Sequence, residues 1–234
     1  MWREMWEAPS TGITEIEPFE IAILCSDNSI RTVQHRGILL NEMGIGIAVF
    51  DDISHRREAE EALRRVAFED PLTGLGNRRV LQEMWGQAIL GGAGIENMVA
   101  ILLIDLDHFK AVNDQLGHDA GDETLVTVAG RLKKSIRGGD LACRMGGDEF
   151  AILLPGLRSP DPVERICQHI STALRRPIRL HGQTAAIGGS IGASLYPQDG
   201  TKLEVLLKRA DEALYRRKAE RTGGWEWYKV PAAA

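Results

Sequence analysis

Two aspartates that follow an apolar run are the first residues with the types and spacing for chemistry. Residues 99–104 form a continuous apolar run, which predicts a buried strand, and Asp105 and Asp107 come at its end. Side chains alternate along a strand, so both carboxylates face the same side. Because neighbouring carboxylates repel each other, their site gains most by holding a cation. The pair alone leaves open the alternative of a polar strand end that caps the next helix.

A second acidic group follows two glycines. Residues 144–150 read Arg-Met-Gly-Gly-Asp-Glu-Phe, and the glycine pair is typical of a tight hairpin that a ligand can approach closely. If this hairpin lies beside the strand that ends at Asp105, the carboxylates of Asp105 and Asp148 can meet. Oxygen ligands of this kind suit magnesium, which keeps waters and takes substrate phosphates. For the hairpin by itself, an ordinary exposed turn is the alternative.

The elements around these acids alternate between strand and helix patterns. Beyond the strand at 99–104, we expect strands at 141–145, 150–154, 185–195 and 225–230, and helices at 123–136, 162–175 and 203–218. This order predicts one α/β sandwich in which helices cover a central sheet.

The front of the chain has a different pattern. Short β-like runs at 19–24, 30–35 and 44–50 predict three antiparallel strands, which need further strands or a partner for stability. Residues 54–69 predict a helix with Ser54 as its N-cap and an apolar stripe through Leu63 and Val66. A short charged helix between two domains is either a solvated linker or half of a two-helix coiled coil.

Composition excludes several classes of protein. The chain has 234 residues and a net charge of -5, which argues against a surface built to coat nucleic acid. The three cysteines, Cys25, Cys143 and Cys167, are odd in number and lack metal-like spacing, so neither a disulfide framework nor a zinc site is indicated. No apolar run approaches the ~18 residues of a membrane span, and residues 1–10 are unlike a signal peptide. The cytoplasm is the expected compartment.

Taken together, the motifs resemble the GGDEF family of diguanylate cyclases. The resemblance begins with Asp-Pro-Leu-Thr-Gly-Leu-Gly-Asn-Arg-Arg at 70–79 and continues through 105–110, 113–114, 117–118 and 121–122. It includes RMGGDEF at 144–150 and ends near Ala-Asp-Glu-Ala-Leu-Tyr at 210–215. Several motifs in order at matching spacing are more specific than one short match. The resemblance implies an α/β (α+β), palm-like domain over residues 70–234, with a central, mostly antiparallel sheet flanked by helices.

The resemblance also implies a reaction and a metal. Members of the family condense two GTP molecules into cyclic di-GMP and two pyrophosphates with Mg²⁺ or Mn²⁺. The metal would be bound by Asp105, Asp148 and the Leu106 carbonyl, with Glu149 supporting the site. Asp148 is also the candidate base for the attacking ribose 3′-hydroxyl, and a water is the alternative acceptor of that proton.

Further roles follow for the nucleotide. Asn113 and Asp122 would read the guanine edge, with His118 lining the same pocket. A carboxylate at Asp122 can accept from the guanine N1–H and exocyclic amine, whereas adenine would leave it unpaired. The cations for the triphosphate and its developing charge would be Lys110, Arg144 and Lys218.

The reaction implies a partner, because the product joins two guanylates by two equivalent bonds. Two domains facing each other across a two-fold axis would bring each 3′-hydroxyl to the other α-phosphate, so we expect a symmetric homodimer. A dimeric helix at 54–69 would raise the effective concentration of the two halves.

An Arg-x-x-Asp motif, Arg137 to Asp140, has the pattern of the family's inhibitory site for cyclic di-GMP. A helix-ending Gly-Gly with incidental charges is the alternative. The chain departs from the family after Tyr215, where residues 216–224 read Arg-Arg-Lys-Ala-Glu-Arg-Thr-Gly-Gly and the family's distal arginine is out of register. Arg221 is the candidate substitute.

Residues 1–53 resemble the last strands of a PAS sensor domain, without a sensory ligand, and 54–69 resemble its exit helix. Other functions stay open: a catalytically silent receptor for cyclic di-GMP, a dimerisation module, or a mononucleotide cyclase.

Overall fold

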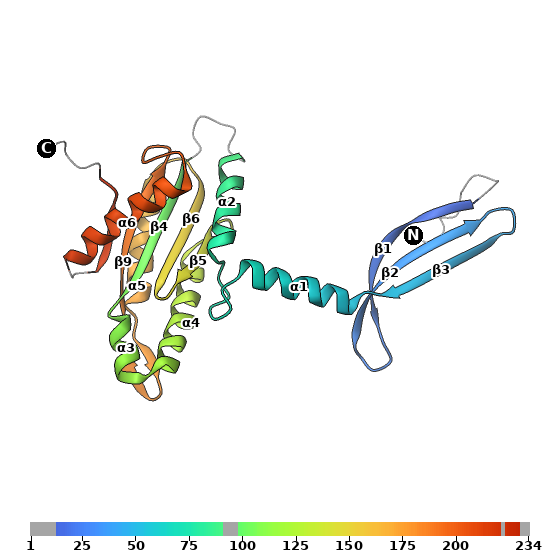
Figure 1. The fold of residues 1–234 in the computed structure, drawn as a ribbon, viewed down its shortest axis with the longest axis horizontal. Helices are drawn as coiled ribbons and strands as arrows, with labels where there is room; N and C mark the ends of the chain where they lie inside the picture. Colours follow the sequence, from blue (N-terminus) through green and yellow to red (C-terminus); the bar gives the residue numbers. More distant parts are fainter. Residues whose placement is uncertain (1–12, 91–97, 221–222, 230–234) are drawn as a thin grey trace. The chain divides into compact units, whose positions relative to one another are not determined.

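A computed structural model describes residues 13–90, 98–220 and 223–229 of the chain. The chain divides into two compact units, Met1–Arg64 and Arg65–Ala234, each with a sheet of its own (Figure 1). The predicted division at 53 and 69 stays a prediction, because the helix α1 (Ser54–Phe68) crosses the boundary between these units. No helix in the described part of the chain is long and apolar enough to cross a membrane.

The second unit is built on a five-stranded sheet. Its strand order is β10-β9-β4-β6-β5, and every neighbouring pair is antiparallel except β10 with β9. The strands are β4 (Met98–Asp107), β5 (Leu141–Gly146), β6 (Glu149–Leu157), β9 (Gly188–Tyr196) and β10 (Gly224–Trp227). This mostly antiparallel central sheet confirms the predicted fold class.

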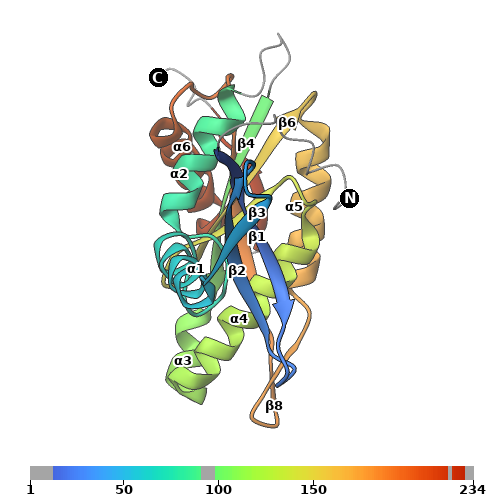
Figure 2. The ribbon, with the colours of Figure 1, turned by 90° about the vertical axis from the view of Figure 1, so that its right-hand side faces the viewer.

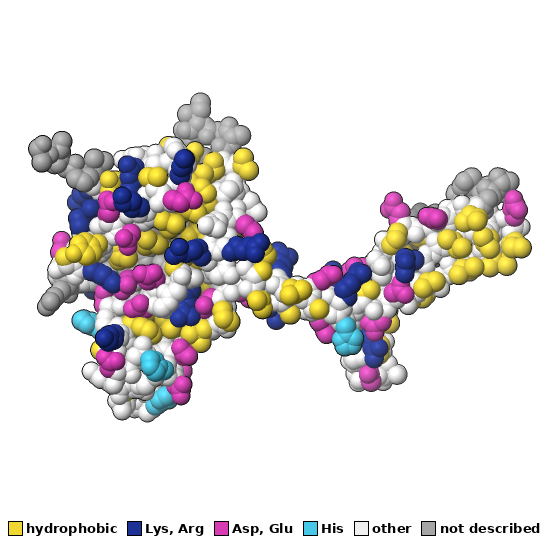
Figure 3. All heavy atoms as spheres, in the orientation of Figure 1, with side chains coloured by type: hydrophobic (Ala, Val, Ile, Leu, Met, Phe, Trp, Pro, Cys, Tyr) yellow, Lys and Arg dark blue, Asp and Glu magenta, His cyan; other side chains and the backbone are white. Residues whose placement is uncertain are grey.

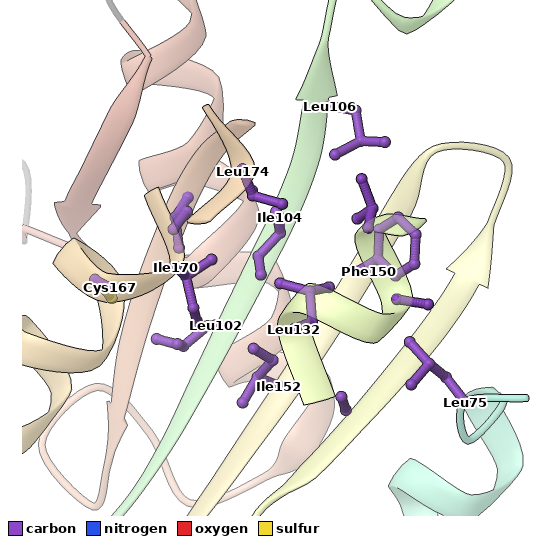
Figure 4. Packing of buried hydrophobic residues seen from close by; sticks show 14 of the residues in the cluster. Leu75, Leu102, Ile104, Leu106, Leu132, Phe150, Ile152, Cys167, Ile170 and Leu174 are labelled. Atoms are coloured by element: carbon purple, nitrogen blue, oxygen red, sulfur yellow. The ribbon is translucent and has the colours of Figure 1, made fainter. Parts of the chain in front are cut away.

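Helices cover both faces of that sheet, as predicted. Alternate β4 residues on one face, such as Leu102 and Ile104, pack with Leu132 of α4 (His118–Ser135) and with α5 (Asp161–Leu174) (Figure 4). The β4 residues on the opposite face, such as Val99 and Ile101, pack with α2 (Arg78–Leu90) and α6 (Leu203–Ala219). Figure 2 shows α5 and α6 on opposite sides of the sheet. The central strand β4 is apolar from Met98 to Ile104 because both of its faces are covered there.

Several boundaries differ from the sequence expectation. The helices α2 and α3 (Phe109–Leu116) were not predicted, and α4 begins at His118 rather than at 123, because the chain turns at Gly117 with φ +88°. The expected strand at 185–195 is split: residues 183–185 form β8 (Gln183–Ala185), which pairs with β7 (Ile178–Leu180), and β9 begins at Gly188. The expected strand at 225–230 ends at Trp227, and Val230 lies outside the described residues.

The first unit is a three-stranded antiparallel sheet, which agrees with three expected strands. The strands are β1 (Ile13–Leu24), β2 (Ile30–Leu40) and β3 (Ile45–Asp52), each longer than predicted. Many of its apolar side chains are exposed, and Figure 3 shows them as an apolar area on this sheet. Ser54 does not act as the predicted N-cap, because its hydroxyl accepts the Thr32 N–H at 2.9 Å. The Ser54 N–H itself donates to Asp52.

Candidate active site

The glycine hairpin lies beside the end of β4, which is the condition that the sequence set for Asp105 and Asp148 to meet. In the β4–β6 ladder, Asp105 pairs directly with Glu149. Gly146 and Gly147, with φ values of +140° and +54°, turn the chain from β5 into β6, a conformation that favours glycine. Asp148 follows this turn and is half-buried. The two acidic motifs, about 40 residues apart in sequence, are therefore neighbours at one end of the sheet.

Asp105 is the buried carboxylate of this group. Burial raises the pKa of Asp105, and the charges of Asp148 and Glu149 raise it further, whereas the Lys218 ammonium opposes them. Lys218 reaches from the end of α6 and places its Nζ 2.5 Å from Asp105 Oδ2. A carboxylate that is buried beside two others is stabilised in its charged form by cations, and Lys218 supplies one.

A cavity of about 560 Å³ opens beside Asp105. Asp107 also lines it, so the two aspartates of β4 do face one side, and the Asp107 carboxylate accepts a 2.8 Å hydrogen bond from Ser190 Oγ. Leu106 also lines the cavity, although the residue is only 2% exposed and belongs to the hydrophobic core. The described lining residues are Asp105, Leu106, Asp107, His108, Arg175, Gly188, Ser190, Lys218 and Gly223.

The donor set here fits a hard divalent cation. Carboxylate and carbonyl oxygens are the ligands that Mg²⁺ prefers, and the surplus of carboxylates around Asp105 favours a positive charge. Within the described ranges, no three His, Cys, Asp or Glu side chains are arranged to hold a metal ion. Magnesium commonly uses few protein ligands and completes its shell with phosphate oxygens and water.

The predicted guanine-reading residues lie on two helices joined at Gly117. Asn113 is on α3, and His118 and Asp122 are on α4. The Asn113 carboxamide packs against Gly121, where an added Cβ would lie 1.9 Å from Asn113 Oδ1. This contact fixes Asn113 beside the residue that precedes Asp122. His118 and Asp122 are exposed, and so is Lys110 on α3.

Arg144 has a different environment from the one expected of a phosphate ligand. Its Nη1 lies 3.2 Å from both carboxylate oxygens of Asp70, and its Nε and Nη2 donate to the Gly147 carbonyl at 2.9 and 2.8 Å. Arg144 is also absent from the described residues that line the cavity. In this structure its guanidinium holds the hairpin to the segment at Asp70.

The Arg-x-x-Asp motif forms a closed turn at the start of β5. Asp140 accepts the Arg137 N–H at 3.1 Å and the Arg137 Nε at 3.0 Å, and Arg137 Nη2 donates to the Pro155 carbonyl at 2.7 Å. The Asp140 side chain is 1% exposed and that of Arg137 is 61% exposed. A second cavity, of about 340 Å³, is lined by both residues and by Lys133.

Sequence reasoning missed three residues that line the first cavity. His108 lies within the matched run 105–110 but was given no role, Ser190 belongs to none of the predicted motifs, and Arg175 was expected only as the end of a helix. Arg221, the candidate for the displaced distal arginine, lies outside the described residues.

Comparisons with known proteins find relatives of the second unit. A family model described as "Diguanylate cyclase, GGDEF domain" matches residues 67–223. Diguanylate cyclase TpbB of Pseudomonas aeruginosa is 38% identical over 168 residues, which are 71% of this chain and 39% of that protein. Response regulator PleD of Caulobacter vibrioides is 42% identical over 163 residues, which are 66% of this chain and 34% of that protein. The chain thus spans well under half the length of these curated relatives.

Solved structures show the same fold. The crystal structure of the GGDEF domain of TpbB (YfiN) from Pseudomonas aeruginosa has a TM-score of 0.65 and 38% identity, and the match covers 68% of this chain and 99% of that one. The coiled coil and GGDEF domain of DgcB from Caulobacter crescentus, solved in complex with c-di-GMP, has a TM-score of 0.66 and 28% identity. That match covers 75% of this chain and 93% of that one.

Proposed function

The chain belongs to the GGDEF diguanylate cyclase family, and we propose that its second unit condenses two GTP molecules into cyclic di-GMP and two pyrophosphates. Each ribose 3′-hydroxyl attacks the α-phosphate of the other nucleotide, so one P–O bond forms and the bond to the leaving pyrophosphate breaks. The observation that carries this proposal is Asp105, which lines the cavity together with its ion-pair partner Lys218 and has its pKa raised by the nearby charge of Asp148.

Asp105, Asp148 and the Leu106 carbonyl are the residues that would hold magnesium or manganese in this proposal. A bound divalent cation supplies charge stabilisation to the α-phosphate and lowers the pKa of the attacking hydroxyl. Asp148 takes the hydroxyl proton, directly or through a water, while Glu149 supports the site from the start of β6. Lys218 lies within reach of both Asp105 and the cavity, so it stabilises the negative charge of the phosphates.

Guanine selection is assigned to the α3–α4 corner. Asp122 accepts hydrogen bonds from the guanine N1–H and exocyclic amine. The Asn113 carboxamide, held in place by Gly121, contacts the same edge of the guanine. His118 lines the same corner. ATP would leave the Asp122 carboxylate without donors, so we expect a large preference for GTP.

The proposed active unit is a homodimer with one nucleotide in each domain. No residue of α1 is buried, and Leu63 and Val66 on this helix are 70% and 82% exposed. Apolar side chains at this spacing suit a two-helix coiled coil, which would raise the effective concentration of the two domains. The dimer would be supported by loss of activity on dilution and weakened by full activity of a monomer.

Product inhibition is proposed at the second cavity. Arg137 presents an exposed guanidinium there, which can pair with phosphate and stack on guanine. The same observation favours one other function, a receptor that binds cyclic di-GMP at Arg137 without making it. The DgcB structure shows a GGDEF domain in complex with c-di-GMP, and that binding is a property of DgcB.

Chromatography of the product formed from GTP and Mg²⁺ tests the proposal. The comparison is between the wild type, Asp148→Asn and Glu83→Gln, a matched loss of one carboxylate on the exposed face of α2. We expect cyclic di-GMP from the wild type and Glu83→Gln, and none from Asp148→Asn. If no protein forms product, while cyclic di-GMP binds and Arg137→Ala abolishes that binding, the chain is a receptor.

A further inference from the structure

The cavity beside Asp105 contains a second cation that no motif predicted. Arg175 directly follows α5. The hydrogen bond from its backbone N–H to the Ser171 carbonyl closes the last turn of that helix. Its side chain lines the cavity together with Asp105 and Lys218. Among the described lining residues, Arg175 and Lys218 are the two with a permanently cationic side chain.

Gly223, on the C-terminal side of α6, lies close to the Arg175 guanidinium. A Cβ on Gly223 would lie 3.6 Å from Arg175 Nη2 and 3.1 Å from Asp107 Oδ2. The guanidinium from α5 and the carboxylate from β4 thus flank the same point of the chain. Because Lys218 reaches the cavity from α6, the two cations come from different elements.

The other basic residues at the end of α6 are committed to the backbone that follows the helix. Arg217 donates to the Gly223 carbonyl, with its Nε at 2.7 Å, and it also pairs with Glu220. Arg216 pairs with Glu226, with its Nε 3.3 Å from the carboxylate. Neither lines the cavity, so neither stands in for the distal arginine that is out of register in this sequence.

The charges in the cavity require more than one cation. A nucleoside triphosphate brings several negative charges to a cavity that already contains the carboxylates of Asp105 and Asp107. Lys218 is already paired with Asp105 at 2.5 Å, so part of its charge is compensated before the nucleotide binds. A guanidinium has a planar set of donors that can bind phosphate oxygens in a bidentate way, which an ammonium cannot.

We propose that Arg175 binds the terminal phosphates of GTP and forms, with Lys218, the cationic side of the triphosphate site; this rests on the proposed function. The inference assigns to the end of α5 a contact that the C-terminal helix of this chain does not supply in register. It is specific to the phosphate chain, so the guanine base and the ribose are recognised independently of Arg175.

Equilibrium binding separates this role from a structural one. Calorimetry in Mg²⁺ measures the affinity for GMP and for a GTP analogue with a methylene group between the α- and β-phosphates. Arg175→Ala should weaken binding of the triphosphate analogue about 10- to 100-fold, as expected for loss of a charged hydrogen-bonding partner, and leave GMP binding unchanged. Arg175→Lys should recover part of the loss. Arg176→Ala is the matched control, since Arg176 is the next residue, is exposed and does not line the cavity.

The outcomes are distinct. Equal weakening of GMP and analogue by Arg175→Ala, or no change in either, overturns the inference, and so does a wild type that fails to bind the analogue. If the wild type makes no cyclic di-GMP but Arg175→Ala selectively loses the analogue, the proposed function fails and the triphosphate contact stands. If product forms and Arg175→Ala behaves like Arg176→Ala, the function stands and the contact fails.

Discussion

Replacement of Gly121 by alanine should strongly lower activity while leaving the fold in place. Gly121 lies in α4, where its missing side chain leaves room for the Asn113 carboxamide of α3. A Cβ at Gly121 would lie 1.9 Å from Asn113 Oδ1 and 3.0 Å from Asn113 Cγ. The obstructing atoms are at the end of a flexible side chain, so Asn113 can rotate away and the backbone can stay.

The size of the effect follows from that distance. Ordinary contact begins at about 3.4 Å, so the carboxamide oxygen must move by roughly 1.5 Å. A misplacement of about 1 Å in a positioning group can cost about 100-fold in rate, so kcat/KM for GTP should fall by about that factor or more. The helix gains up to about 1 kcal/mol from exchanging glycine for alanine, so the free energy of unfolding should change little.

Gly130→Ala on the same helix is the control, because no atom lies within 4 Å of a Cβ at Gly130. It should raise the free energy of unfolding by about 1 kcal/mol and leave kcat/KM unchanged. The assay combines steady-state GTP kinetics with urea unfolding of both variants and of Asn113→Ala. If Gly121→Ala retains wild-type kcat/KM, Asn113 does not read guanine. If it instead loses more than about 3 kcal/mol of stability, Asn113 cannot rotate and the steric reasoning is wrong.

Three further outcomes are expected. Phe150→Ala, at a fully buried position behind the hairpin, should lower the free energy of unfolding in urea by about 3–5 kcal/mol. Asp70→Asn should cost about 2 kcal/mol at pH 7. Burial acts to raise the pKa of Asp70, but hydrogen bonds from Thr73 and the Arg144 ion pair outweigh it and lower the pKa. The stability difference between wild type and Asp70→Asn should therefore be largest above the pKa of Asp70 in the unfolded chain, which is about 4. It should shrink as the pH falls through the lowered pKa of Asp70 in the folded protein. A pH-independent difference would contradict this. Burial raises the pKa of the Cys143 thiol to about 12, so a maleimide at pH 7.5, followed by mass spectrometry, should label Cys143 only after unfolding.

The sequence was informative wherever an element is long and buried on a clear pattern. The apolar run that became β4 and the periodic helices α5 and α6 were predicted because burial selects their residue types. The helix α3 was missed because it has only 8 residues and follows His108 in a left-handed conformation, too short for periodicity to show. In α2 only Leu81 and Trp85 are buried, so its apolar stripe is thin.

The acids of the site were also predictable, and their partners were not. Strand alternation and the glycine hairpin place each acid at the end of its own element, and the long-range pairing of β4 with β6 then brings Asp105 close to Asp148. The ion pairs of Lys218 with Asp105 and of Arg144 with Asp70 join segments far apart in sequence, and tertiary packing decides them. Arg175 had no local signal, because a basic residue at a helix end is ordinarily a solvated cap.

The environment of Arg144 shows how two motifs far apart in sequence are joined in the structure. The opening motif is joined to the hairpin motif by the Asp70–Arg144 ion pair and by Gly76, which accepts the Arg144 N–H at 2.8 Å and lies along β5. Asn77, the next residue, donates to the Ala67 carbonyl at the end of α1 and accepts from the first turn of α2. These contacts connect the last turn of α1, through a covered sheet edge, to the turn that presents Asp148. A displacement of that last turn would therefore reach the acidic hairpin before it reached the α3–α4 corner, so a signal arriving through α1 should alter kcat more than the affinity for guanine.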